Sequence, residues 1–356
     1  MFRICILKCR PGARGCRAPD PFFSNCWYAI MDFYQAFVLA VIQGLTEFLP
    51  VSSSAHLILP SQLLGWPDQG LVFDISVHVG TLLAVLIYFR KELRLMTVNL
   101  LGWLFRRNAL DTDGRMLLCV LLGTVPVGLA GLLFKGFIET ALRSDYVIAV
   151  TTIVFGIVLL LSEIYNRQAL NNPERENRIF EAMGSEAAGA SAADAPAASA
   201  AADSPGSPKV PGYFGHIMNT VKERDNVRAF GLALIIGCAQ AVALIPGTSR
   251  SGITMTAGYF LRLSPENAAR FSFLLSIPVI ILSGLMGVKD LIVHGSGTAG
   301  GADIPMIVVG TLVSFAVALL VIRLFLKFLT RIGLLPYVIY RILLGITLFA
   351  VLGAAD

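Results

Sequence analysis

Long apolar runs without charged residues alternate with short polar segments along most of this chain. Four uncharged runs have roughly the length that crosses the hydrocarbon core of a bilayer: Met116–Phe134, Tyr146–Ser162, Phe271–Val288 and Ile304–Ile322. Two more runs have polar interruptions, Leu71–Phe89 at Asp74 and His78, and Leu335–Ala354 at Arg341. The pattern predicts an all-α integral membrane protein with about six transmembrane helices.

Two pairs of shorter apolar segments are each joined by a turn rich in proline and serine. Phe33–Thr46 precedes Leu57–Leu64 in the first pair, and Ala229–Ile245 precedes Ile253–Leu261 in the second. Non-helical backbone at membrane depth is tolerated only where protein or a wet cavity satisfies its polar groups. The pattern therefore predicts two re-entrant helix pairs whose turns form a functional site.

Positive charges predict the direction of each half. Lys and Arg concentrate in residues 90–115 and 165–228, which we expect on the cytoplasmic side. Two predicted spans separate these segments, so the two re-entrant pairs enter the bilayer from opposite faces. The sequence thus predicts an inverted-topology repeat, residues 31–164 and 229–356, with the two turns meeting near the middle of the bilayer.

The remaining segments do not have the composition of a membrane domain. We expect residues 165–228 to be a cytoplasmic linker that is disordered around 184–209, where Val, Ile, Leu and Phe are missing and no core can form. Residues 1–30 have no clear period and no standard signal peptide. We expect them to be an extension outside the membrane domain, with Met31 as an alternative start.

Composition agrees with the hydropathy pattern. Hydrophobic residues make up 56% of the chain and charged residues 14%, and the mean hydropathy is +0.73, values that a soluble globule of this length would not show. The net charge of +5 reflects which loops stay in the cytoplasm, and no nucleic-acid partner is expected. The six cysteines lack the spacing of a zinc site or a disulfide framework.

Ionisable residues in the two turns carry the candidate chemistry. Glu47 lies four residues after Gln43, on the same face of a helix, and an acid at membrane depth is costly unless it is paired, bound to a cation or facing water. Arg250 is the only arginine in either turn, and its planar guanidinium suits phosphate oxygens. An internal Glu47–Arg250 ion pair is the structural alternative, and it is compatible with a catalytic role.

Hydroxyl groups and glycines around these residues favour anion binding. Successive backbone amides at a helix start form an anion-binding nest, although serine-rich turns are also ordinary helix caps. His56 could serve as general acid, base or nucleophile, and Asp74 and His78 share a helix face from which they would support the site. The candidate phosphate-binding residues are Ser52, Ser54, Gly247, Thr248, Ser249 and Arg250, and the candidate catalytic residues are Glu47, Ser53 and His56.

The two turns resemble known motifs. Gln43-Gly-Leu-Thr-Glu47-Phe-Leu-Pro-Val-Ser-Ser-Ser-Ala-His56 and Pro246-Gly-Thr-Ser-Arg-Ser-Gly252 are similar to the signature motifs of the bacterial undecaprenyl-diphosphatase family, also called the bacitracin-resistance protein family. The likeness runs from about Phe33 to the C-terminus and includes Phe271-Ser-Phe-Leu-Leu-Ser-Ile-Pro278 and Pro336-Tyr-Val-Ile-Tyr-Arg341. The linker and residues 1–30 fall outside it.

This resemblance implies an activity, a location and a cofactor. The activity is removal of the terminal phosphate from undecaprenyl diphosphate, which regenerates the monophosphate carrier for cell-wall synthesis and confers bacitracin resistance. The location is the bacterial inner membrane, in a multi-pass protein whose site opens to the extracytoplasmic side. The cofactor is a divalent cation, Mg²⁺ or Ca²⁺, with Glu47 and Gln43 as expected ligands, although many members have glutamate in place of Gln43. A homodimer is compatible with the sequence, which does not determine the oligomeric state.

The residues leave the mechanism partly open. Arg250 and the turn amides would hold the terminal phosphate, and either Ser53 or His56 would attack it or activate water. A transporter or lipid flippase is the main alternative function, because inverted repeats with broken helices are typical of transporters. A phosphatidic-acid-type phosphatase is disfavoured, because Thr256 stands where its Ser-Arg motif would require histidine.

Overall fold

The computed structural model describes residues 32–66, 69–106, 110–134, 136–138, 142, 144–170, 226–294 and 304–355. Within them the chain is helical and contains no strand, which confirms an all-α protein. The first half contains α1 (Phe33–Thr46), α2 (Ser53–Leu64), α3 (Gly70–Tyr88), α4 (Arg90–Arg106), α5 (Thr112–Leu133) and α7 (Asp145–Leu170). The second half contains α10 (Asn226–Val242), α11 (Arg250–Phe260), α12 (Pro265–His294), α13 (Ile304–Ile332) and α14 (Leu335–Ala355). The predicted N-terminal extension and most of the predicted linker lie outside the described residues. The two ends of the linker, 165–170 and 226–228, belong to α7 and α10, so the linker is shorter than predicted.

Five of the described helices are long and apolar enough to cross a membrane, namely α3, α5, α7, α12 and α13. The sixth predicted span is α14, whose apolar part, Leu335–Val351, is shorter than these five. Many outward-facing side chains on the spans are large and apolar, and Leu121, Leu285 and Leu312 are 47%, 62% and 60% exposed. Apolar surface of this extent is stable against lipid and not against water. The chain is therefore a multi-pass membrane protein.

One charged segment folds differently from the prediction. Residues 90–106 form α4, where the sequence indicated only a charged loop. Met96 on this helix is 1% exposed in the main hydrophobic core, and α4 packs against α5. Packing of Met96 and the apolar side chains near it therefore stabilises a helix in a segment whose charges had indicated a loop.

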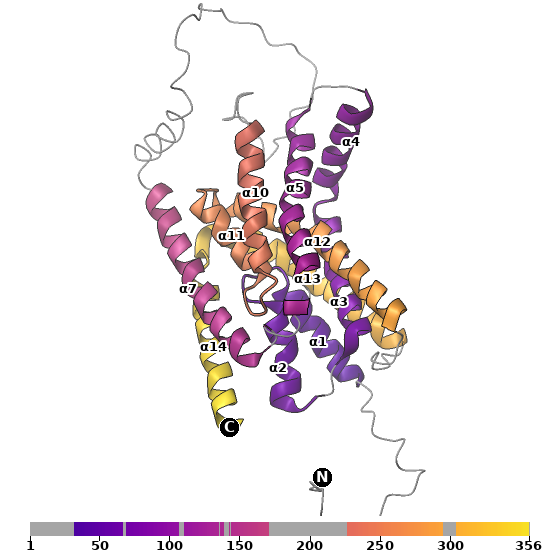
Figure 1. Ribbon diagram of the computed structural model, residues 1–356, viewed down its shortest axis with the longest axis vertical. Helices are drawn as coiled ribbons and strands as arrows, with labels where there is room; N and C mark the ends of the chain where they lie inside the picture. Colours follow the sequence, from indigo (N-terminus) through magenta and orange to yellow (C-terminus); the bar gives the residue numbers. More distant parts are fainter. Residues whose placement is uncertain are drawn as a thin grey trace, which may run out of the picture.

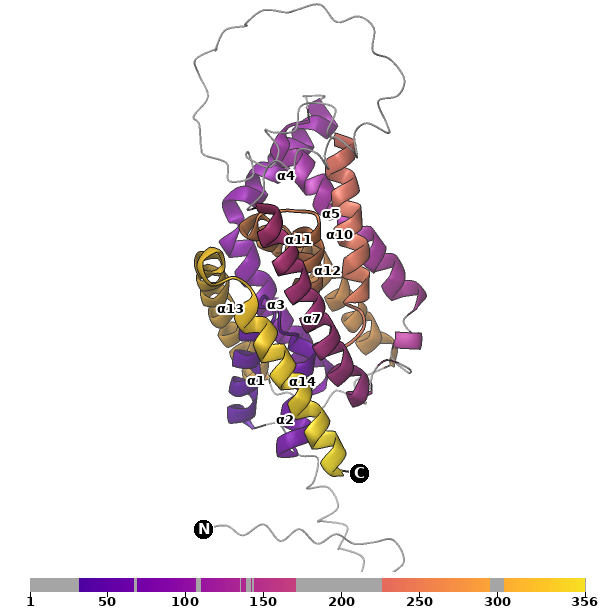
Figure 2. The same cartoon turned by 90° about the vertical axis from the view of Figure 1, so that its left-hand side faces the viewer.

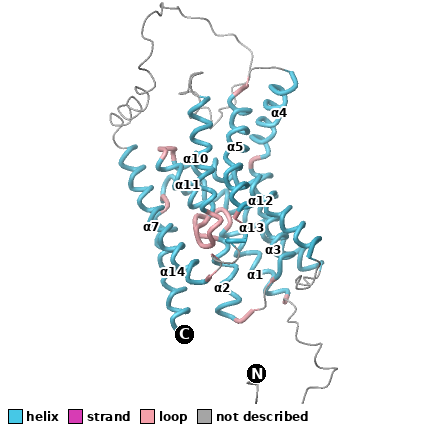
Figure 3. The backbone as a smooth tube through the Cα atoms, viewed as in Figure 1, coloured by secondary structure: helices cyan, strands magenta, loops and turns pink. Residues whose placement is uncertain are grey.

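The two short helix pairs approach the middle of the bundle from opposite ends. In Figure 1, α1 and α2 lie in the lower half and α10 and α11 in the upper half. The connecting loops lie together in the centre of the bundle in Figure 3, and the Ser251 hydroxyl of the second turn donates to the Leu49 carbonyl of the first at 2.8 Å. The bundle therefore brings the two polar turns into direct contact.

Each half packs into the other. The first helix of the first half, α1, packs against α13, and the first helix of the second half, α10, packs against α5. The last helices of the two halves, α7 and α14, lie side by side (Figure 2). Glycines permit the closest approaches, since a Cβ on Gly237 of α10 would lie 2.3 Å from the Gly123 carbonyl oxygen of α5. These contacts between the two halves fix the positions of the helices that carry both turns.

Candidate active site

A serine in an unusual backbone conformation starts the second helix of each short pair. Ser52 precedes α2 with φ 80°, and Ser249 precedes α11 with φ 70°. Side chains other than glycine rarely occupy this region, so the surrounding structure must hold both residues there. Gln43 precedes Ser52 by the same number of residues as Gln240 precedes Ser249, and both glutamines are fully buried. The strained serines, rather than the prolines, are therefore the points at which the two turns correspond.

Glu47 is the centre of the predicted site. Its Oε1 accepts a hydrogen bond from Arg250 Nη2 at 2.6 Å, and its Oε2 accepts from Gln43 Nε2 and Ser53 Oγ, each at 2.9 Å. His78 Nε2 lies 3.8 Å from Oε2. The predicted ion pair is thus present, and it joins the first turn to the second.

Because this ion pair is buried, the stability of the fold depends on both of its charges. Glu47 is 7% exposed, and the Arg250 side chain is 16% exposed and also donates to the Ser276 carbonyl at 3.2 Å. Phe48, the neighbour of Glu47, packs edge-on against Phe273 in the main core, with ring centroids 5.2 Å apart. Removing either charge would leave the other buried without its partner, which is far more costly than losing an exposed pair.

Ser53 contacts Glu47 from the start of α2. It is the first residue of α2, it is partly exposed, and its hydroxyl proton points at the Glu47 carboxylate. Its neighbour Ser54 is exposed and lies within 3.2 Å of the Ser52 hydroxyl oxygen. A partly exposed hydroxyl paired with a buried carboxylate has the arrangement of a nucleophile with its base.

The amides at the start of α2 have no side-chain cap, whereas Ser249 caps α11 by accepting from the Gly252 amide at 3.2 Å. The first amides of a helix have no partner within the helix, so the start of α2 presents free donors beside Ser53. Phosphate oxygens are suitable acceptors for these donors. The two turns are thus alike in backbone but different in what they offer an anion.

His56 is held by hydrogen bonds at both ring nitrogens. Nδ1 lies 2.6 Å from the Ser52 carbonyl oxygen, and Nε2 lies 2.5 Å from the Tyr340 hydroxyl oxygen, with the two rings stacked 10° from parallel. A carbonyl can only accept, so Nδ1 carries the proton, and Nε2 of the neutral ring accepts from Tyr340. His56 therefore has no free lone pair in this arrangement, and Glu47 rather than His56 contacts Ser53.

Arg341 ties the two turns together from α14. Its guanidinium is fully buried and donates to the carbonyls of Gly247 at 3.0 Å, Thr152 at 3.2 Å and Pro50 at 3.4 Å. One side chain thus satisfies a carbonyl of each turn and one of α7. Without these donors, the buried carbonyls at membrane depth would lack partners.

Four of the six predicted phosphate-binding residues are buried in the protein, namely Ser52, Gly247, Thr248 and Ser249. Thr248 is fully buried, and its Oγ1 has no partner among the described residues. Gly247, with φ 87°, packs so closely on α7 that a Cβ would lie 2.3 Å from Thr151 Oγ1. Gly247 therefore allows close packing of the turn, while Gln43, Glu47, Ser53 and Arg250 gather at one point.

The donor set next to Glu47 fits a hard divalent cation in part. Gln43 Oε1 is buried and has no partner among the residues that the structure describes, and it belongs to the same amide that donates to Glu47. The described residues hold no cluster of three His, Cys, Asp or Glu side chains. One carboxylate and one amide oxygen are nevertheless enough for an ion that takes its other ligands from water and substrate phosphate, as Mg²⁺ usually does.

Sequence reasoning missed the contribution of α14. Tyr340 and Arg341 are adjacent in the sequence, and together they contact His56 and both turns. The signal was present, because Arg341 is the single charged residue in an apolar run, and such residues are expensive unless they have a role. Its partners could not be predicted, since all of them are backbone carbonyls in distant segments.

The sequence matches the family described as Bacitracin resistance protein BacA over residues 36–191 and 210–347. The chain belongs to this family. The matched residues include both turns and the Tyr340–Arg341 pair of α14. Residues 192–209, in the predicted linker, lie outside the match.

Curated relatives cover nearly the whole chain. Undecaprenyl-diphosphatase of Teredinibacter turnerae is 46% identical over 321 residues, which are 90% of this chain and 99% of that protein. Undecaprenyl-diphosphatase 2 of Stutzerimonas stutzeri is 44% identical over 321 residues, 89% of this chain and 97% of that protein. Undecaprenyl-diphosphatase of Alcanivorax borkumensis is 44% identical over 318 residues, 89% and 98% of the two chains.

Proposed function

We propose that this member of the family is an undecaprenyl-diphosphate phosphatase, which hydrolyses undecaprenyl diphosphate to undecaprenyl phosphate and inorganic phosphate. The observation that carries the proposal is the Ser53–Glu47–Arg250 group, a hydroxyl, a base and a cation joined by contacts of 2.9 and 2.6 Å. Breaking a P–O–P link requires an in-line nucleophile and neutralisation of charge, and this group supplies both. The names of the relatives agree with this activity.

The proposed reaction takes place in two steps. Ser53 Oγ attacks the terminal phosphorus while its proton moves to Glu47 Oε2, and the bond from this phosphorus to the bridging oxygen breaks. Undecaprenyl phosphate leaves with that oxygen, and a phosphoserine remains. Water then attacks the phosphoserine, so that inorganic phosphate leaves and the proton returns to the Ser53 oxygen.

Binding of the diphosphate would rearrange the ion pair. Arg250 has further N–H donors beyond its bonds to Glu47 and the Ser276 carbonyl, and these can hold phosphate oxygens together with the free amides of α2. When phosphate shares the guanidinium, Glu47 becomes a stronger base for the Ser53 proton. A divalent cation, held by Glu47 and Gln43 and by the substrate, would supply further charge neutralisation at the phosphate oxygens.

We infer that the lipid tail lies along the apolar helices, with only the diphosphate in the polar site. Three observations support an inverted-topology repeat. The two helix pairs enter the bundle from opposite ends, Ser52 and Ser249 share a strained backbone conformation, and α1 and α10 each pack against a helix of the other half. Such a repeat places the site near the middle of the bilayer. An inner-membrane location with extracytoplasmic access remains part of this proposal.

The deciding experiment measures phosphate release from undecaprenyl diphosphate by the purified protein, with and without a chelator. We expect one phosphate to be released per lipid, and the release to stop when the chelator removes divalent cations. A folded sample that binds the lipid but releases no phosphate would overturn the proposal and favour a transporter. A homogeneous elution profile in detergent and a cooperative melting curve would establish that the sample is folded.

Tyr340 is predicted to position the first turn through His56. Replacing Tyr340 by phenylalanine removes the donor to His56 Nε2, so that the ring and the Ser52 carbonyl beside Ser53 lose a constraint. One hydrogen bond contributes about 1 kcal/mol, so we expect kcat to fall by about fivefold while KM changes little. Steady-state kinetics would test this. Tyr337→Phe, on the same helix, serves as the control, and an equal effect of the two variants would contradict a specific role of Tyr340.

A further inference from the structure

One face of α13 is apolar and exposed along almost its whole length. Every fourth residue from Val308 to Ile332 is apolar and exposed, and Leu312, Leu320 and Phe328 are 60%, 56% and 39% exposed. Residues four apart lie on the same side of a helix, so these side chains form one continuous apolar stripe. Because such a surface is stable against lipid and not against water, the apolar stripe of α13 contacts acyl chains in the membrane.

Three cationic side chains accompany the apolar stripe, and only near the C-terminal end of α13. Arg323, Lys327 and Arg331 each precede a member of the stripe by one residue, and all three are exposed. Residues 304–322 of the same helix carry no charge. These uncharged residues extend over about 28 Å, close to the thickness of a hydrocarbon core of about 30 Å. The cations therefore begin where an acyl chain on the stripe ends and its head group starts.

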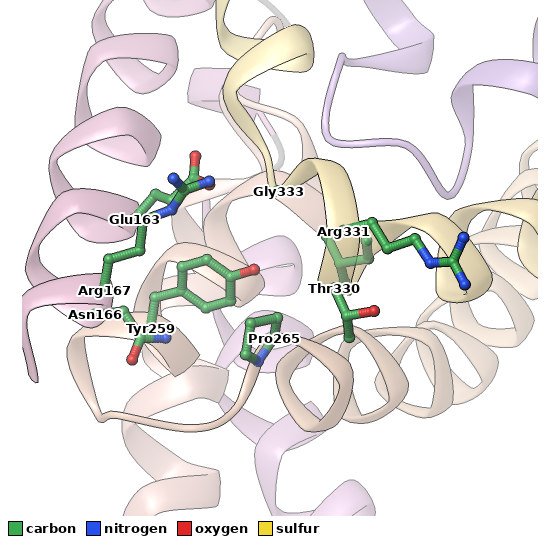
Figure 4. Close-up of a pocket in the computed structure, with 9 residues that line it drawn as sticks. Glu163, Asn166, Arg167, Tyr259, Pro265, Thr330, Arg331 and Gly333 are labelled. Atoms are coloured by element: carbon green, nitrogen blue, oxygen red, sulfur yellow. The ribbon is translucent and has the colours of Figure 1, made fainter. Parts of the chain in front are cut away.

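None of these three cations has an acidic partner within the described residues. Lys327 Nζ lies 5.7 Å from the ring centroid of Phe328, its neighbour in the apolar stripe. Arg331 lines a polar cavity together with Glu163 and Arg167, but it points away from Glu163 in Figure 4, and Glu163 Oε1 accepts from Arg167 at 2.7 Å. All three cations are thus available to anions from outside the chain.

We propose that the end of α13, residues 323–332, binds the head groups of anionic phospholipids. The acyl chains lie along the apolar stripe, and the phosphate oxygens accept hydrogen bonds from Arg323, Lys327 and Arg331. Basic residues at the end of a membrane helix attract anionic lipid, whereas a zwitterionic lipid brings a cation of its own. This inference goes beyond the proposed phosphatase activity and does not depend on it, because lipid binding can be measured without turnover.

A second copy of the chain fits this face less well than lipid does. The two-fold axis of a dimer in one membrane runs along the bilayer normal, so the apolar stripe would meet its own copy at the same depth. Arg323, Lys327 and Arg331 would then lie opposite the same three cations, and like charges facing each other across an interface oppose association. Charge complementarity therefore favours an anionic lipid as the occupant.

Native mass spectrometry of the purified full-length protein would test the proposal, with phosphatidylglycerol and phosphatidylcholine of identical acyl chains. We expect phosphatidylglycerol to bind at least about tenfold more tightly, since a single basic residue near the membrane surface strengthens anionic-lipid binding about fivefold. Equal binding of the two lipids would overturn the proposal. Glycerol 1-phosphate has the phosphate but no acyl chains and should not compete at the same concentration; full competition would overturn the lipid assignment in favour of a soluble phosphate.

Variants locate the preference within the protein. Lys327→Gln should weaken binding of phosphatidylglycerol about fivefold and leave binding of phosphatidylcholine unchanged, and replacing Arg323, Lys327 and Arg331 together by glutamine should abolish the preference. Lys289→Gln is the matched control, because it removes one exposed lysine of α12 that lies outside the stripe. A preference that survives the triple substitution, or an equal loss in Lys289→Gln, would overturn the assignment to α13. A wild-type dimer that dissociates on Phe328→Ala would overturn it in favour of a second copy.

Discussion

Replacing Glu47 by glutamine is expected to lower the turnover of undecaprenyl diphosphate by about a thousandfold, because the Ser53 proton then has no base to accept it. Glutamine has nearly the same shape as glutamate and keeps an oxygen toward Arg250, so the turn should keep its backbone conformation, although the loss of the buried counter-charge of Arg250 should lower the thermal stability. The loss should appear in kcat, measured by phosphate release at saturating lipid. Binding of the lipid should change by a much smaller factor.

The matched control is Glu266→Gln, which also removes an acid paired with an arginine, Arg270, at 3.1 Å, but on α12 rather than in either turn. Because the Glu266 pair is partly exposed, we expect little change in either turnover or thermal stability. Near-normal turnover by a folded Glu47→Gln protein would exclude Glu47 as the base. Loss of the fold in Glu47→Gln alone would instead indicate that the ion pair is chiefly structural.

Replacing Ser53 by alanine is expected to abolish turnover to a similar degree, because the proposed phosphoenzyme cannot form. Ser53 donates a single hydrogen bond to Glu47, and its loss should cost only about 1 kcal/mol of stability. The variant should therefore fold and bind the lipid. Rapid acid quenching of the wild type with radiolabelled lipid should trap a phosphoserine that is missing from Ser53→Ala.

A second serine provides the control for this substitution. Ser283 on α12 donates to the Ile280 carbonyl of its own helix at 3.0 Å, and Ser283→Ala should retain wild-type turnover. If Ser53→Ala kept more than about a tenth of the activity, direct attack by water would replace the covalent mechanism. Loss of activity in both variants would indicate a general sensitivity of the helices to serine substitution.

The choice between Ser53 and His56 as the nucleophile could be made only with the tertiary structure. The sequence places both residues in the same turn, and either side chain can act as a nucleophile. The tertiary structure separates them, because His56 is held between the Ser52 carbonyl and the Tyr340 hydroxyl while Ser53 contacts Glu47. Tyr340 is remote in the sequence, so no local pattern could show that His56 is already engaged.

The sequence by itself determined the membrane class, most helices and the residues of the central group. Hydropathy reports burial against lipid directly, so α1 was predicted with its observed bounds, Phe33–Thr46, and the five long spans were all located. Glu47 and Arg250 were found because an isolated charge in an apolar run is costly and needs a reason.

The tertiary structure alone decided which groups meet. Whether Glu47 pairs with Arg250, whether Thr248 is open or buried, and which carbonyls Arg341 satisfies depend on how α1, α10 and α14 pack. The helix α4 and the cavity beside Glu163 likewise arise from contacts between distant segments. Hydropathy sums the preferences of single residues for lipid or water, whereas a hydrogen bond depends on the position of both partners, and in this protein the partners come from opposite halves of the chain.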